Sequence, residues 1–138
     1  MADLAGKLGI RPGMVVALVG APPGWSPGAL PDGARVRRGL RGGADVVVAF
    51  LRRAAELETV VPAVVGVLGP HDALWLAWPR RAAGHDSDLG DAVVRGAALV
   101  TGLVDVKVAA LGEDWSGLRF VWRREHRHEV RPRRPSST

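Results

Sequence analysis

The chain has 138 residues, of which 47% are hydrophobic, and this length predicts one domain with its own core. It has no cysteine, which excludes disulfides, thiolate chemistry and cysteine metal ligands, and no apolar run approaches the roughly 20 residues that span a bilayer. Of the net charge of +5, residues 123–138 supply +4 through six arginines and two glutamates, so the rest of the chain lacks the basic excess typical of a nucleic-acid reader.

The N-terminal part predicts a strand that runs into an unusual turn. Residues 3–9 suit a short helix, and residues 14–19 suit a buried strand. Residues 20–33, with four prolines and four glycines, predict a loop where a crossover helix normally lies. Directly after the strand stands Gly20-Ala-Pro-Pro-Gly-Trp25, at the place of a nucleotide-binding glycine turn. Its two prolines lack the N–H groups that hold an anion, so the cofactor loop is missing from the expected scaffold.

The middle of the chain alternates strands with a helix. Residues 35–38 predict a short strand near an edge, and residues 45–50 a strand buried on both faces. Residues 52–68 carry apolar side chains at three- and four-residue spacing, which predicts a helix kinked or split at Pro62. Residues 73–78 predict the next strand.

The last third predicts one more helix and a hairpin. Residues 80–86 form a loop, and Ser87 is expected to cap a helix from Asp88 to about residue 101. Two strands follow, over residues 104–111 and 118–123, and the glycine-containing segment between them favours a hairpin.

These elements predict an α/β fold. Residues 1–123 are expected to form a single three-layer Rossmann-like domain, with a mostly parallel sheet and an antiparallel C-terminal hairpin at its edge. This arrangement resembles a truncated class I methyltransferase sheet. Residues 124–138 predict a basic, disordered tail in which Val130 is the only strongly apolar residue, so we expect its deletion to leave the melting temperature nearly unchanged.

Six segments carry a resemblance to a known family. They are Leu8-Gly-Ile-Arg-Pro-Gly, Leu18-Val-Gly-Ala-Pro-Pro-Gly-Trp25, Leu74-Trp-Leu-Ala-Trp-Pro-Arg-Arg81, Asp86-Ser-Asp-Leu89, Gly102-Leu-Val-Asp-Val-Lys-Val108 and Trp115-Ser-Gly-Leu-Arg-Phe-Val121. Together they resemble a family of small bacterial proteins known only as a domain of unknown function. The resemblance implies a Rossmann-like fold and brings no established activity, so no catalytic residue is carried over.

A candidate anion site follows from the topology, because ligands of open α/β sheets lie outside the carboxyl ends of the parallel strands. Guanidinium groups, a hydroxyl and free N–H groups at a helix start would suit a phosphate or a carboxylate. The alternative is that the arginines are solvated and the serine is only a cap. The candidate residues are Gly20, Gly24, Trp25, Arg80, Arg81, Ser87 and Asp88.

Other chemistries find little support. Ser87 and Asp88 lie near His85, but residues adjacent in one loop rarely form a catalytic triad, and the chain has no Gly-x-Ser-x-Gly turn. The histidines and glutamates of residues 125–129 lack a fixed scaffold for a metal. We therefore expect no catalytic residue, no metal and no cofactor.

The five tryptophans are unusual beside two phenylalanines and no tyrosine. Trp75 and Trp78 are three apart on a strand and should point to opposite faces. Trp25 and Trp115 are expected in loops, where they either cover core edges left by the missing helix or offer a stacking surface to a base or a partner.

Three function classes remain. The favoured one is a non-catalytic Rossmann-like module that binds an anionic metabolite, a nucleotide or a protein partner. An S-adenosylmethionine-dependent methyltransferase with an atypical loop is the first alternative, although residues 36–39 lack the acid that normally holds the ribose hydroxyls. A regulatory interaction module acting through tail and tryptophans is the second, and the tail could also bind nucleic acid weakly. Because no secretory signal is visible, a cytoplasmic location without membrane contact is expected.

Overall fold

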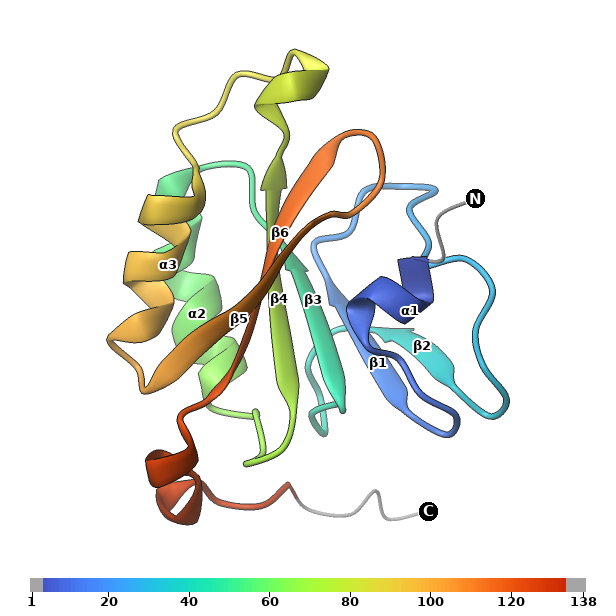
Figure 1. The fold of residues 1–138 in the computed structure, drawn as a ribbon, viewed down its shortest axis with the longest axis vertical. Coiled ribbons are helices and arrows are strands. Elements are labelled where there is room, and N and C mark those ends of the chain that lie inside the picture. The colour runs from blue at the N-terminus through green and yellow to red at the C-terminus, as the bar shows by residue number, and fades with distance from the viewer. Residues whose placement is uncertain (1–3, 134–138) are drawn as a thin grey trace.

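The computed structural model describes residues 4–133 and contains one six-stranded sheet in the order β2-β1-β3-β4-β6-β5 (Figure 1). Strands β2, β1, β3 and β4 are parallel, and β6 runs antiparallel to both of its neighbours. The strands are β1 (Val15–Val19), β2 (Arg35–Arg38), β3 (Val46–Phe50), β4 (Ala73–Pro79), β5 (Leu103–Ala110) and β6 (Trp115–Trp122).

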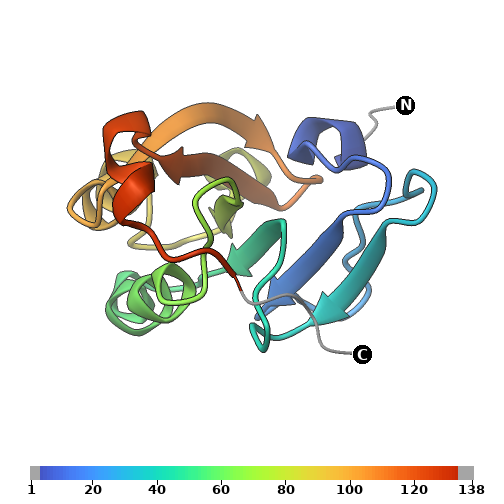
Figure 2. The ribbon, with the colours of Figure 1, turned by 90° about the horizontal axis from the view of Figure 1, so that it is seen from below.

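Helices cover the sheet on both faces. Helices α2 and α3 pack on one face, whereas α1 lies on the other, as Figures 1 and 2 show. The helices are α1 (Leu4–Leu8), α2 (Leu57–Val65) and α3 (Asp91–Leu99), with 3-10 turns η1 (Ala54–Glu56), η2 (Arg81–Ala83) and η3 (Arg124–Glu129). The predicted three-layer α/β fold with a mostly parallel sheet is confirmed. None of the helices within residues 4–133 has the length and apolar character needed to cross a membrane.

The two faces of the sheet carry separate hydrophobic clusters. The cluster under α2 and α3 includes Val61, Val94 and Trp78, and the cluster under α1 includes Leu8 and Trp75. Trp75 and Trp78 thus point to opposite faces, as their spacing predicts. Residues from the 20–33 loop complete the α1 side in place of a crossover helix.

The predicted antiparallel C-terminal hairpin lies at one edge of the sheet. Strand β6 inserts between β4 and β5, so that β5 forms the edge. The burial of the side chains on the two strands explains this order. Leu118 and Phe120 of β6 are buried, whereas Val106 and Val108 of β5 are 51% and 66% exposed. Strand β6 carries the larger buried apolar surface, and it lies at the inner position, between two neighbouring strands.

Both long helices begin later than predicted. Helix α2 starts at Leu57, after η1, and includes Pro62 without being divided by it. Helix α3 starts at Asp91 and its N-cap is Gly90, so the prediction that Ser87 caps this helix is wrong. The Ser87 hydroxyl instead donates to the Arg52 carbonyl (3.0 Å) and accepts the N–H of Leu89 (3.2 Å), which closes a turn before the helix.

The described part of the tail is folded against the body, contrary to the expected disorder. Residues 124–129 form η3, His126 stacks on Trp122 at 5.2 Å between ring centroids, and Val130 packs against the core. The segment runs along the end of the sheet where the parallel strands begin (Figure 2). Residues 134–138 lie outside the described residues, and the domain boundary at residue 123 stays a prediction.

Candidate functional site

The carboxyl ends of β1 and β3 mark the point where the strand order reverses, which is where ligands of this architecture normally bind. Gly20 follows β1 with φ +68°, and a Cβ on it would lie 3.0 Å from the carbonyl oxygen of Phe50 at the end of β3. Arg52 Nη1 donates to the Gly20 carbonyl at 3.1 Å. The turn therefore packs directly on the end of β3.

An aromatic cluster fills the remaining space at this crevice. Trp25 and Trp115 both meet Phe50 edge-on, with ring centroids 4.8 and 5.0 Å apart. The indole N–H of Trp25 donates to the Leu111 carbonyl at 3.1 Å, and the Arg52 guanidinium lies 5.5 Å from the Trp115 ring. These contacts favour the interpretation that the two tryptophans cover the core where a helix is missing.

A hollow of about 570 Å³ lies beside the carboxyl end of β4, at the start of α3. Arg80 is half-buried there. Its backbone N–H donates to Asp114 O (2.8 Å), and its Nη1 donates to Glu113 O (3.3 Å). Arg81, the first residue of η2, is exposed. The lining residues are Trp78, Val108, Ser116 and residues 80–82 and 88–93.

The N-terminus of α3 opens into this hollow without a side-chain cap. Gly90 is the N-cap, and no side chain bonds to the first-turn N–H groups from that position. Such a helix end favours negative charge. Two carboxylates stand at the same rim: Asp91 bonds only to the neighbouring N–H of Ala92, and Asp88 accepts the N–H of Ala54 at 2.7 Å. The hollow therefore offers donors for an anion and acceptors for hydroxyl or ammonium groups.

The predicted site residues divide between these two places. Arg80, Arg81 and Asp88 line the hollow, with Ser87 beside it but engaged with the backbone. Gly20, Gly24 and Trp25 belong to the β1 turn, across β3 and β4 from the hollow. The seven residues therefore do not share one site. The prediction of an anion site stays a prediction, and it now concerns only the group that contains Arg80 and Arg81.

Sequence reasoning missed several lining residues. Gly90 followed by Asp91, an acid in the first turn, is a helix-start signal that was available in the sequence. Val108 and Ser116 reach the hollow only because β6 inserts beside β4, where Ser116 pairs with Trp78. A hairpin pattern does not reveal that order.

Triad and metal geometries do not assemble among the residues that the structure describes. His85 Nε2 lies 2.8 Å from Asp114 Oδ1, and the Ser87 hydroxyl donates to the backbone, so these side chains face different partners. Within residues 4–133 no three histidine or acidic side chains gather as metal ligands would.

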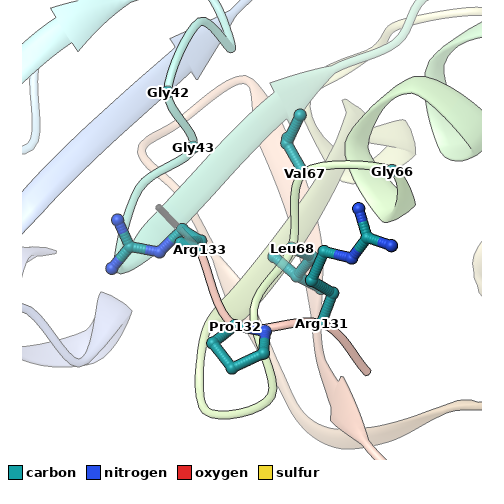
Figure 3. A pocket seen from close by; sticks show the side chains of 8 residues that line it. All are labelled: Gly42, Gly43, Gly66, Val67, Leu68, Arg131, Pro132 and Arg133. Atoms are coloured by element: carbon teal, nitrogen blue, oxygen red, sulfur yellow. The ribbon is translucent and has the colours of Figure 1, made fainter. Parts of the chain in front are cut away.

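A further hollow, of about 280 Å³, lies at the opposite end of the sheet beside the C-terminal segment. Figure 3 shows Arg131 and Arg133 pointing apart on either side of Pro132. Arg133 Nε lies 2.7 Å from Asp72 Oδ2, and its Nη2 lies 2.9 Å from Asp45 Oδ1. Because two carboxylates already neutralise Arg133, this hollow is a weaker place for an anion.

Comparison with known proteins bears on the fold. No protein-family model matches the sequence, and no curated protein is significantly similar to it. The structure is similar to the Bacillus subtilis M1A22 tRNA methyltransferase TrmK, with a TM-score of 0.54 and 15% identity, over 91% of this chain and 68% of that one. The chain has a methyltransferase-like fold. An antibiotic-resistance methyltransferase, Kmr, matches at 15% identity over 86% of this chain and 91% of its own, but the TM-score of 0.43 is too low to add to this conclusion.

Proposed function

We propose that this protein is a non-catalytic Rossmann-like module that binds an anionic metabolite or nucleotide in the hollow between β4 and α3. One observation carries the proposal: two arginines and an uncapped helix start meet at this hollow. The crevice at β1 and β3, where this architecture normally binds ligands, is filled by protein side chains.

The side chains of the hollow suit a ligand that has an anionic group at one end and hydroxyl groups at the other. The Arg80 guanidinium donates one bond, from Nη1 to the Glu113 carbonyl in the β5–β6 turn, and its other N–H groups suit a phosphate or a carboxylate. Asp88 and Asp91 would accept bonds from hydroxyl groups on the other end. Trp78 and Val108 supply apolar wall between them. A phosphorylated, hydroxyl-bearing metabolite combines these groups.

Stabilisation by phosphate tests the proposal. At matched ionic strength we expect phosphate to raise the melting temperature of the wild type above its value in chloride, and we expect this increment to be smaller in the Arg80→Ala, Arg81→Ala variant. The control Arg38→Ala, Arg41→Ala removes two exposed arginines near β2, and the phosphate increment should persist there. If phosphate stabilises the Arg80/Arg81 variant as much as the wild type, the hollow is not an anion site.

An S-adenosylmethionine-dependent methyltransferase is the second candidate, favoured by the fold shared with TrmK. The β1 turn speaks against it, because its prolines lack N–H donors and Gly20 lies against the Phe50 carbonyl. The end of β2, Arg38 followed by Gly39, also has no carboxylate for ribose hydroxyls. We expect isothermal titration with S-adenosylmethionine to give no micromolar binding, and such binding with competition by adenosine would make this candidate the better one.

A further inference from the structure

Three cationic side chains lie near the end of α1, on the sheet face opposite to α2 and α3. Lys107 and Arg119 are paired directly across β5 and β6. Lys107 Nζ donates to the Lys7 carbonyl at 3.0 Å, and a Cβ on Gly9 would lie 3.6 Å from Arg119 Nη2. The charge of Arg11 acts on Arg119. We refer to Arg11, Lys107 and Arg119 as the α1 cationic cluster.

The α1 cationic cluster has no anionic partner among residues 4–133. None of its members forms an ion pair with a carboxylate there. Arg119 Nε is buried without a hydrogen-bond partner. Burial lowers the pKa of the Arg119 guanidinium, and the neighbouring charge of Arg11 lowers it further. Like charges placed opposite each other across two strands destabilise a sheet, so this arrangement carries an unfavourable electrostatic energy.

Capping of α1 does not account for the two arginines. A helix C-terminus attracts cations because its last carbonyls lack partners. Here the carbonyls of residues 5–8 already accept bonds from Ile10, Gly9, Lys107 and Trp75, at 3.0 to 3.1 Å. Lys107 thus has a structural role, whereas Arg11 and Arg119 remain without one.

We propose that the α1 cationic cluster binds a phosphate group through Arg119 and Arg11. A phosphate dianion would offset more of the clustered charge than a carboxylate, and a guanidinium fork matches its oxygens. No aromatic side chain belongs to the cluster, so the phosphate itself is what is recognised, whether a small phosphoester or a nucleic-acid backbone carries it. The site is independent of the β4–α3 hollow, which uses the opposite face of the sheet.

Side-chain NMR of the full chain tests this site directly. The arginine Nε–Hε signals are followed during titration with pyrophosphate, and the Arg119 signal is assigned by its loss in Arg119→Lys. We expect a saturable shift of the Arg119 signal, and Arg11→Gln should weaken the apparent affinity about tenfold, since a bond to a charged group is lost. The matched control Arg124→Gln, an exposed arginine in η3, should leave the affinity unchanged.

Two further experiments distinguish the possible carriers of the phosphate group and distinguish this site from the β4–α3 hollow. A shift with pyrophosphate but not with a single-stranded oligonucleotide indicates a small phosphoester, whereas tighter, strongly salt-dependent binding of the oligonucleotide indicates a nucleic-acid backbone. In the Arg80→Ala, Arg81→Ala background the Arg119 response should persist, so failure of the β4–α3 proposal does not affect it. The inference is overturned if neither probe shifts the Arg119 signal saturably, or if Arg11→Gln binds as the wild type does.

Discussion

At the scale of single residues, Asp72 is the buried charged side chain with the clearest consequence. It is 6% exposed, and its Oδ2 accepts both the Gly69 N–H and Arg133 Nε at 2.7 Å. Burial raises the pKa of Asp72, an effect that Arg133 and the Gly69 bond offset only in part. The fold therefore prefers an uncharged group that still accepts these bonds.

We expect Asp72→Asn to keep or raise the wild-type stability at pH 7, and Asp72→Ala to lower it by about 1–3 kcal/mol. The alanine leaves the buried Gly69 N–H without an acceptor, whereas the amide oxygen retains it. Urea unfolding of both variants measures the difference. Equal destabilisation by the two substitutions would show that the negative charge itself is needed.

Asp105 has the opposite pH dependence. The hydrogen bond from Arg95 Nε, at 3.0 Å, lowers the pKa of Asp105 below its ordinary value of 3.8. A depressed folded pKa gives stability that is present above pH 3.8 and is lost as the pH falls through the folded value. Asp72, with its raised pKa, instead gives stability that is present below pH 3.8 and is lost as the pH rises through its folded value.

Asp105→Asn should therefore flatten the loss of stability below about pH 4. Asp72→Asn should act at higher pH, where it removes the gain in stability that protonation of Asp72 gives as the pH falls toward 3.8. Urea midpoints measured from acid to neutral pH compare the two variants with the wild type. Parallel curves for Asp105→Asn and the wild type would mean that the Arg95 bond does not distinguish the charged carboxylate.

At the scale of elements, the 20–33 loop replaces a helix and is held by Trp25. Its ring packs on Phe50 and its N–H bonds to the Leu111 carbonyl. We expect Trp25→Ala to lower the unfolding free energy by about 2–4 kcal/mol, somewhat below the loss for a fully buried aromatic ring. Trp25→Phe, which keeps the ring contact and loses the hydrogen bond, should cost only about 1 kcal/mol. Chemical denaturation that finds both variants equal to the wild type would show that the loop is not fastened by this residue.

Most strands were predictable, whereas the starts of α2 and α3 were not, and β6 begins at Trp115, a residue that was expected in a loop. Buried runs such as residues 14–19 and 73–78 match β1 and β4 within one residue, because the need to bury apolar side chains acts locally. Ser87 looks like a cap in sequence, but its hydroxyl bonds to the carbonyl of Arg52, 35 residues away. Tertiary contacts of this kind compete with capping and leave no local pattern.

At the scale of the whole molecule, the sequence predicts which strand ends carry the candidate residues. It does not predict which crevice at these strand ends stays open to a ligand. That depends on whether Trp25 and Trp115 fold inward onto Phe50, which composition does not determine. The tail shows the same limit. An arginine-rich segment with little apolar content predicts disorder. The sequence does not show that Arg133 pairs with Asp45, which lies 88 residues earlier.

The C-terminal segment therefore affects the stability of the whole fold. We expect truncation after Arg123 to lower the unfolding free energy by about 3 kcal/mol, the lower end of the range for breaking a buried pair, because Asp72 stays buried without Arg133. Truncation after Arg133 retains every contact described above and should leave the melting temperature unchanged.

Combining the shorter truncation product with Asp72→Asn separates charge from packing. If the stranded carboxylate is the main cost, Asp72→Asn should recover most of the stability that truncation after Arg123 removes, a coupling visible in a double-mutant cycle. Any remaining loss then belongs to the Val130 and His126 contacts and to the lost Arg133–Asp45 pair. Should the two truncations melt at the same temperature as the full chain, residues 124–133 contribute nothing to stability, and the behaviour expected from their composition alone would hold.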